Sequence, residues 1–135
     1  MLQIAQGVSS PQTHQNDWSN YLGNNANQIG GIKIDVDTSN CGFTTSPHYL
    51  VSIEGIGGWN WHLSGLNCLY NVSPNGFTVY LRWTDDPSSN IPPGSTNEPN
   101  PLRVSTAVDK GWSLRWTAIK TCPCEKKEND DRPKE

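Results

Sequence analysis

Charged side chains are scarce in this sequence, and long apolar runs are missing. Only 17% of the 135 residues are charged, and the formal net charge is −3. No basic patch is present, so we expect no nucleic-acid partner. The longest apolar stretches span a few residues, so we expect neither a transmembrane helix nor membrane insertion.

A secretory signal peptide is also not evident, because the start Met1-Leu2-Gln3-Ile4 lacks a basic region and an adequate apolar region. Three interpretations fit this start: a mature form, a fragment of a longer protein, and a protein exported without a cleaved signal.

The sequence also lacks helical periodicity, since nowhere do apolar residues recur at helical spacing over three turns. The chain instead carries 12 Gly, 10 Pro and 6 Trp, a composition typical of an all-β protein with long loops. Its length suits one domain with a real core. Residues 125–135 hold nine of the charged side chains. We therefore expect one domain over residues 1–124 and a disordered, charged tail over residues 125–135.

The four cysteines do not have the spacing of a zinc site, and we expect no metal or other cofactor. Cys122 and Cys124 are too close for an easy internal bridge but could link neighbouring chains. Cys41 and Cys68 are the plausible internal pair. Four reduced thiols in a cytosolic protein are the alternative. Disulfides are favoured, which indicates an oxidising, extracellular or surface-exposed location.

Alternating apolar and polar residues predict six short strands. The clearest is 77–83, where Phe77, Val79 and Leu81 alternate with polar residues. The turn signature Ser73-Pro74-Asn75-Gly76 joins it to the preceding apolar run as a β-hairpin. The other strands are expected at 2–8, 32–36, 48–54, 66–72 and 112–117, with long loops at 9–31 and 87–108. This pattern indicates an all-β, antiparallel, six-stranded β-sandwich. Trp83, Trp112 and Trp116 are expected in its core.

The order of motifs resembles the H-type lectins, the family of snail agglutinins and discoidin C-terminal domains. The resemblance covers residues 3–120, and its strongest part is the hairpin 69–77. The other matching positions are Gln6-Gly7, Trp18, Ile32 and Ile34, Cys41, Pro47, Leu50-Val51-Ser52-Ile53, and the strand from Trp112 to Ile119.

The resemblance implies a β-sandwich that forms homotrimers, sometimes paired into hexamers. Family members bind galactose or N-acetylgalactosamine, without catalysis, at clefts between subunits. The aromatic and His that the family often has at the end of its fifth strand fall at Thr84 and Asp85 here, and the strand-four Arg of the snail lectins falls near Ser64.

Three groups of residues are candidates for sugar binding. In the first, Trp59 and Trp61 could stack on the C–H face of a sugar while His62 donates to a hydroxyl. The alternative is that both Trp side chains close the end of the sandwich.

The second group is Arg82 with Asp85 and Asp86. The carboxylates can accept hydrogen bonds from neighbouring hydroxyls, and the Arg can bind the carboxylate of an acidic sugar. The alternatives are a surface ion pair and an Arg that lines a trimer axis.

The third group, Asp17 and Asn20, lies in the first long loop, which the resemblance implicates in sugar contacts. The alternative is a solvated cover loop anchored by Trp18.

The sequence therefore predicts a lectin or adhesin that binds galactose-type, N-acetylgalactosamine-type or acidic glycans on cell surfaces or glycoproteins. Weak single sites would gain avidity in a homotrimer. The alternative is a trimeric fibre-tip or structural module that binds protein and no sugar. We do not expect an enzyme, because the adjacent Asp85 and Asp86 cannot flank one glycosidic bond as a catalytic pair.

Overall fold

The computed structural model describes residues 2–21, 30–84 and 102–121 of the chain. These residues form eight β-strands, one α-helix and two 3-10 helices. In chain order the elements are β1 (Gln3–Ser9), β2 (Trp18–Tyr21), β3 (Gly31–Asp37), η1 (Ser39–Cys41), β4 (His48–Gly55), η2 (Asn60–His62), β5 (Leu63–Ser64), β6 (Leu69–Ser73), β7 (Gly76–Trp83), α1 (Val104–Asp109) and β8 (Trp112–Lys120). The predicted tail at 125–135 lies outside the described residues.

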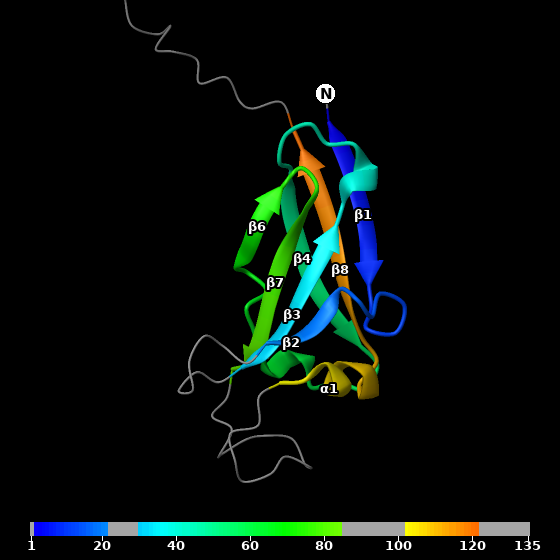
Figure 1. Cartoon of the computed structure of the whole chain (residues 1–135), viewed down its shortest axis with the longest axis vertical. Coiled ribbons are helices and arrows are strands. Elements are labelled where there is room, and N and C mark those ends of the chain that lie inside the picture. Colours follow the sequence, from blue (N-terminus) through cyan, green and yellow to red (C-terminus); the bar gives the residue numbers. More distant parts are fainter. Residues whose placement is uncertain (1, 22–29, 85–101, 122–135) are drawn as a thin grey trace, which may run out of the picture.

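Two antiparallel sheets face each other, as Figure 1 shows. One has three strands in the order β1-β8-β4. The other has five strands, with β2-β3-β7-β5 in order and β6 also paired with β7. The prediction of an all-β, antiparallel sandwich is therefore confirmed. The six predicted strands correspond to β1, β3, β4, β6, β7 and β8, and the structure adds the short strands β2 and β5.

The β6–β7 hairpin has the predicted turn. Ser73 pairs with Gly76, so Pro74 and Asn75 form a two-residue connection. Gly76 is required here because a Cβ atom on it would lie 2.2 Å from the carbonyl oxygen of Val36 in the neighbouring strand. The turn residue thus also allows β3 to approach β7 closely.

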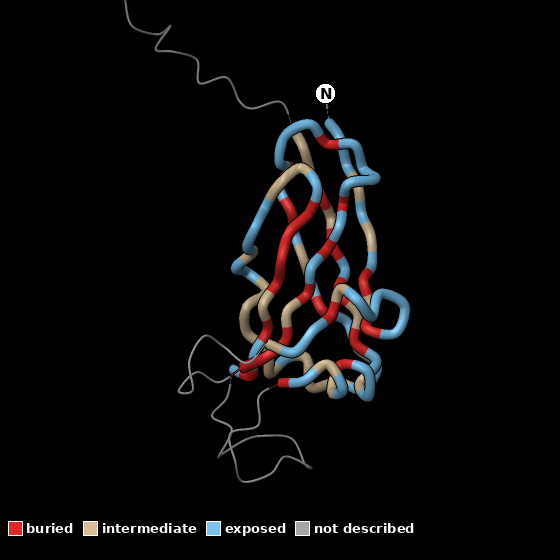
Figure 2. Tube along the Cα trace, in the orientation of Figure 1, coloured by how far each residue is buried: buried red, intermediate tan, exposed pale blue. Residues whose placement is uncertain are grey.

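The core lies between the sheets and is built from the inward-facing residues of each strand (Figure 2). Trp83, Trp112 and Trp116 are all buried, as predicted. Tyr49 of β4 crosses the core, and its hydroxyl donates to the carbonyl of Ser73 at 2.8 Å and hydrogen bonds with Thr38 at 2.8 Å. This buried polar link joins the two sheets at the hairpin end.

Two elements occur where long loops were predicted. β2 lies within 9–31, and its Trp18 is buried with its indole N–H donating to the Ser9 hydroxyl at 2.9 Å. α1 begins within 87–108, ends at Asp109, and covers the end of the sandwich shown at the bottom of Figure 1. A four-residue strand and a six-residue helix are too short to show a clear period in the sequence.

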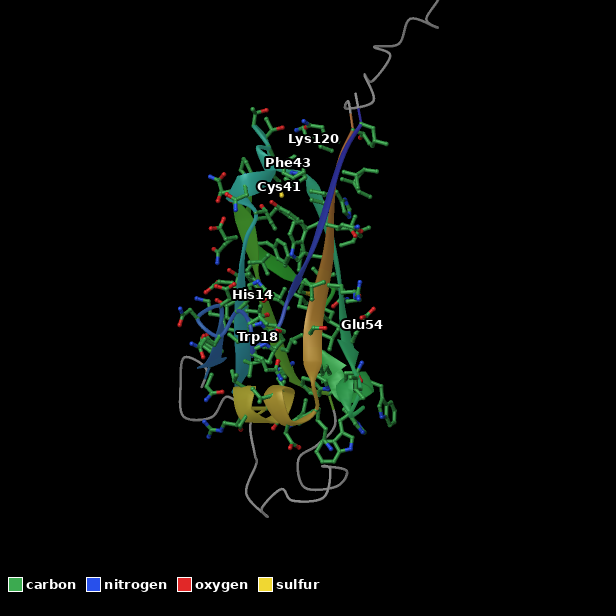
Figure 3. The ribbon with its side chains drawn as sticks, turned by 90° about the vertical axis from the view of Figure 1, so that its right-hand side faces the viewer. His14, Trp18, Cys41, Phe43, Glu54 and Lys120 are labelled. Atoms are coloured by element: carbon green, nitrogen blue, oxygen red, sulfur yellow. The ribbon has the colours of Figure 1, made fainter. Side chains whose placement is uncertain are left out.

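The predicted disulfide between Cys41 and Cys68 is wrong, because both are free and exposed. Cys41 follows β3 beyond the point where Asp37 pairs with Gly76, near Phe43 at the end opposite α1 (Figure 3). Cys68 precedes Leu69 at the other end of β6. A disulfide requires Cα atoms within about 7 Å, and these positions do not provide that. Cys122 and Cys124 lie outside the described residues.

Candidate functional site

The loop 55–62 is held firmly against the start of β8. A Cβ atom on Gly55 would lie 2.2 Å from the Trp112 ring, so only Gly allows this approach. The Trp112 indole N–H donates to the carbonyl of Gly58 at 2.8 Å. The Gly57 N–H donates to the carbonyl of Lys110 at 2.9 Å. These contacts fix the loop that carries the first group of candidate residues.

Trp59 and Trp61, predicted together, have different environments. Trp59 adopts a left-handed backbone conformation with φ 67°, which is unusual for a bulky residue. Its ring packs against the core, and the Lys110 ammonium lies 3.6 Å from the ring centroid. Trp61 is 80% exposed. Trp59 therefore closes the end of the sandwich, while Trp61 leaves a large aromatic surface available to a ligand.

His62 lies between the exposed Trp61 and the buried end of β7. The His62 ring is 4.1 Å from the Trp61 ring between centroids and 6.4 Å from the Trp83 ring. The Thr84 N–H donates to the carbonyl of His62 at 2.6 Å. His62 thus supports the Trp61 ring from the protein side and ties the loop to β7.

Arg82 is exposed on β7, and its Cα is paired with that of Ser64 in β5, the strand that directly follows η2. The two described ion pairs, Lys33 with Asp35 and Arg115 with Glu54, do not involve it. Asp85 and Asp86, its predicted partners, lie outside the described residues. Arg82 is therefore an exposed cation on the strand that pairs with β5, and β5 directly follows the loop that carries Trp61 and His62.

The two remaining candidates lie at the opposite edge of the five-stranded sheet. Asp17 is half-buried, and its main-chain carbonyl accepts the Asp35 N–H at 2.9 Å. The Asn20 side-chain oxygen accepts the Val104 N–H at 2.8 Å and so caps α1. β2 and β5 are separated by two strands, so these residues lie about 14 Å or more from the loop side. One chain does not bring them to Trp61.

Lys110 is the contributor that sequence reasoning missed. It lies just before β8 and covers Trp59 only because the loop 55–62 folds back onto that turn. No local motif links positions 59 and 110, so this contact could not be predicted from the sequence.

The carboxylate at the end of β3 has a shifted pKa. The pKa of Asp37 is lowered, because its carboxylate accepts hydrogen bonds from the side chain and the main chain of Ser39. Asp37 ends β3, on the far side of the molecule from α1. The same hydrogen bonds join the end of β3 to η1, away from the loop 55–62.

Within residues 2–21, 30–84 and 102–121, no group of His, Cys, Asp and Glu side chains is arranged to hold a metal ion. None of the helices in these ranges could span a membrane.

Comparison with models of known protein families, with curated proteins and with solved structures finds no match for this chain.

Proposed function

We propose that this protein is a carbohydrate-binding module of the H-type lectin kind that recognises galactose-type, N-acetylgalactosamine-type or acidic glycans outside cells. The single observation that carries the proposal is Trp61, a large aromatic ring that is 80% exposed on a firmly held loop. An exposed indole offers a large apolar face with a polar N–H group, which a ligand or partner can cover.

The chemistry of the site fits a sugar. One face of a pyranose ring is rich in C–H groups and packs on an indole, while its hydroxyls need polar partners. The His62 ring lies 4.1 Å from the Trp61 ring between centroids, so a sugar stacked on the indole would have a polar ring beside it. Arg82, an exposed cation on the adjoining strand, would favour a carboxylated sugar.

We also propose that the protein works as a homotrimer, with a hexamer as a further step. The support is an apolar face on the outside of β1-β8-β4, formed by Ile4, Val8, Leu50 and Ile119. Ile4 is 61% exposed and Leu50 is 51% exposed. Copies of the chain packing through this apolar face would bury it from water.

Assembly would also give the remaining candidates a role. Family sites lie between subunits, so Asp17 and Asn20 of one copy are proposed to contact a sugar held by Trp61 of another. Within one chain these residues lie on opposite edges of a sheet. Three sites in one trimer would raise the avidity for a multivalent glycan.

A second function is favoured by one observation. Ile56, in the same loop, is fully exposed. Two exposed apolar side chains on one loop also suit a protein contact, as a trimeric fibre tip without sugar binding would need.

A glycan array with matched variants separates these functions. The wild type is expected to bind galactose-type or acidic glycans. Trp61→Ala should weaken binding at least about tenfold, because the stacking surface is removed. Ile56→Ala, a change at a fully exposed residue of the same loop, should stay within about twofold. A blank array with a folded wild type, or equal losses in both variants, would contradict the lectin proposal.

A further inference from the structure

A row of three tyrosine rings crosses the outside of the five-stranded sheet, away from the loop 55–62. The rings of Tyr21 and Tyr80 lie 5.0 Å apart between centroids, and those of Tyr70 and Tyr80 lie 5.1 Å apart. They come from β2, β7 and β6. We name Tyr21, Tyr80 and Tyr70 the tyrosine row.

The register of the strands explains why these rings meet on one face. Val79 and Leu81 point into the core, so Tyr80 between them points outward. Tyr21 is paired with Gly31 of β3, which has no side chain. The Tyr21 ring can therefore lie across β3 and reach Tyr80.

A polar network lies beside the tyrosine row and is satisfied within the protein. The Thr78 hydroxyl donates to Asp35 at 2.7 Å and accepts from the Asn71 side-chain amide at 3.2 Å. The Lys33 ammonium lies 3.4 Å from the other carboxylate oxygen of Asp35. The negative charge of Asp35 is thus already balanced by Lys33, and the carboxylate keeps lone pairs for further hydroxyl donors.

Arg82 gives this face a second cation, which no described ion pair balances. It is two residues from Tyr80 along β7, about 7 Å away and on the same side of the sheet. By register it is also next to Gly31, in the same cross-strand line as Tyr21. The face therefore combines aromatic rings, hydrogen-bonding groups and one exposed guanidinium.

We propose that the tyrosine row and Arg82 form a second carbohydrate site, which binds an acidic polysaccharide built from uronic acids. Sugar rings pack on Tyr70 and Tyr80, and a uronate carboxylate pairs with the Arg82 guanidinium. Tyr70 is 54% exposed, so a ligand can reach its ring. The proposal extends the proposed function to another surface, and of the residues discussed for the Trp61 site it uses Arg82 alone.

Charge and apolar area argue for this ligand over the alternatives. Nucleic acid needs several phosphate-neutralising cations, whereas this face has Lys33, already paired, and Arg82. A second copy of the chain would fit the apolar face of the other sheet better, because Ile4, Val8 and Leu50 are exposed there.

The test is affinity electrophoresis of the whole chain in gels that contain polygalacturonate, a uronic-acid polymer, or neutral galactan. Polygalacturonate should retard the wild type more strongly than galactan does. Tyr70→Ala and Arg82→Gln should each weaken polygalacturonate binding about tenfold. Two controls should stay within about twofold: Val72→Ala, exposed on the same strand, and Arg115→Gln, an exposed cation on the other sheet.

Three results would overturn the proposal: no retardation of the wild type, equal losses in Arg82→Gln and Arg115→Gln, or a lower native mass for Tyr70→Ala. The second would mean charge attraction without a site, and the third an interface between copies. Trp61→Ala separates the two carbohydrate proposals, because it should leave polygalacturonate binding unchanged. A blank glycan array with retained polygalacturonate binding would remove the Trp61 proposal alone.

Discussion

The two sheets bury similar side chains inward but present different ones to solvent. The outer side of β1-β8-β4 carries the apolar face, with Ile4 and Leu50 more than half exposed. The outer side of β2, β3, β7 and β6 carries tyrosine rings and hydrogen-bonded polar groups. The inward alternation specifies the sandwich, while the outward residues specify what each sheet can contact.

The outer faces of the two sheets also differ in the number of hydrogen bonds and ion pairs that link their polar side chains. Thr78 on the five-stranded sheet is only 4% exposed and joins Asp35 to Asn71. The outer side of the three-stranded sheet carries the Arg115–Glu54 ion pair, with 2.6 Å between Nε and Oε2 and both side chains more than half exposed. An exposed pair of this kind contributes about 0–1 kcal/mol. One outer face is thus rigidified by its own network, and the other is left for burial by a partner.

The largest effect is expected from a charge on the apolar face. Leu50→Glu should convert the proposed trimer to a monomer, because an unpaired carboxylate buried in each interface costs about 3 kcal/mol or more. The monomer should keep its stability within about 0.5 kcal/mol, since Leu50 is half exposed. Sedimentation velocity measures the mass. Tyr70→Ala on the other sheet is the control and should remain trimeric; an unchanged mass for Leu50→Glu would refute the role of the apolar face.

A matched pair of threonine substitutions tests whether the hydrogen-bond network around Thr78 stabilises the protein more than an outward threonine on the other sheet does. Thr78→Val should lower the free energy of unfolding by about 1–3 kcal/mol, because it leaves Asp35 and Asn71 without their shared partner. Thr117→Val, at an outward position of β8 between Gln6 and Leu50, should change it by less than about 0.5 kcal/mol. Urea unfolding gives both values. Equal effects would mean that the network contributes no more than an ordinary surface position.

The smallest expected change in the free energy of unfolding comes from a substitution at the edge of the five-stranded sheet. Asn20→Ala should lower the free energy of unfolding by about 1 kcal/mol, since the Val104 N–H loses its acceptor at the start of α1. Thermal unfolding measures this loss. Unchanged stability would argue against the capping role, and Asn20→Asp, which keeps an oxygen acceptor, is the control.

The sequence predicted the parts of the fold that depend on local pattern. Period-two alternation located the strands, and the Ser-Pro-Asn-Gly turn signature located the hairpin between Ser73 and Gly76. Trp112 and Trp116 were assigned to the core for the same reason. These features depend on near neighbours in the chain, so a sequence pattern can reveal them.

Features that depend on distant segments were not predictable in this way. The different environments of Trp59 and Trp61 follow from Lys110 and Trp112, about 50 residues away. The cap that Asn20 provides to α1 joins positions 84 residues apart. The pairing of Cys41 with Cys68 failed for the same reason, because cysteine number carries no information on where each thiol lies.

Native mass spectrometry of the wild type with a galactose-type oligosaccharide tests the central claim most directly, because one spectrum reports both assembly and binding. The account predicts a trimer that carries up to three sugars, and a Trp61→Ala trimer that carries none at the same concentration. A monomer, or a wild-type trimer that remains without sugar across galactose-type and acidic oligosaccharides, would contradict it.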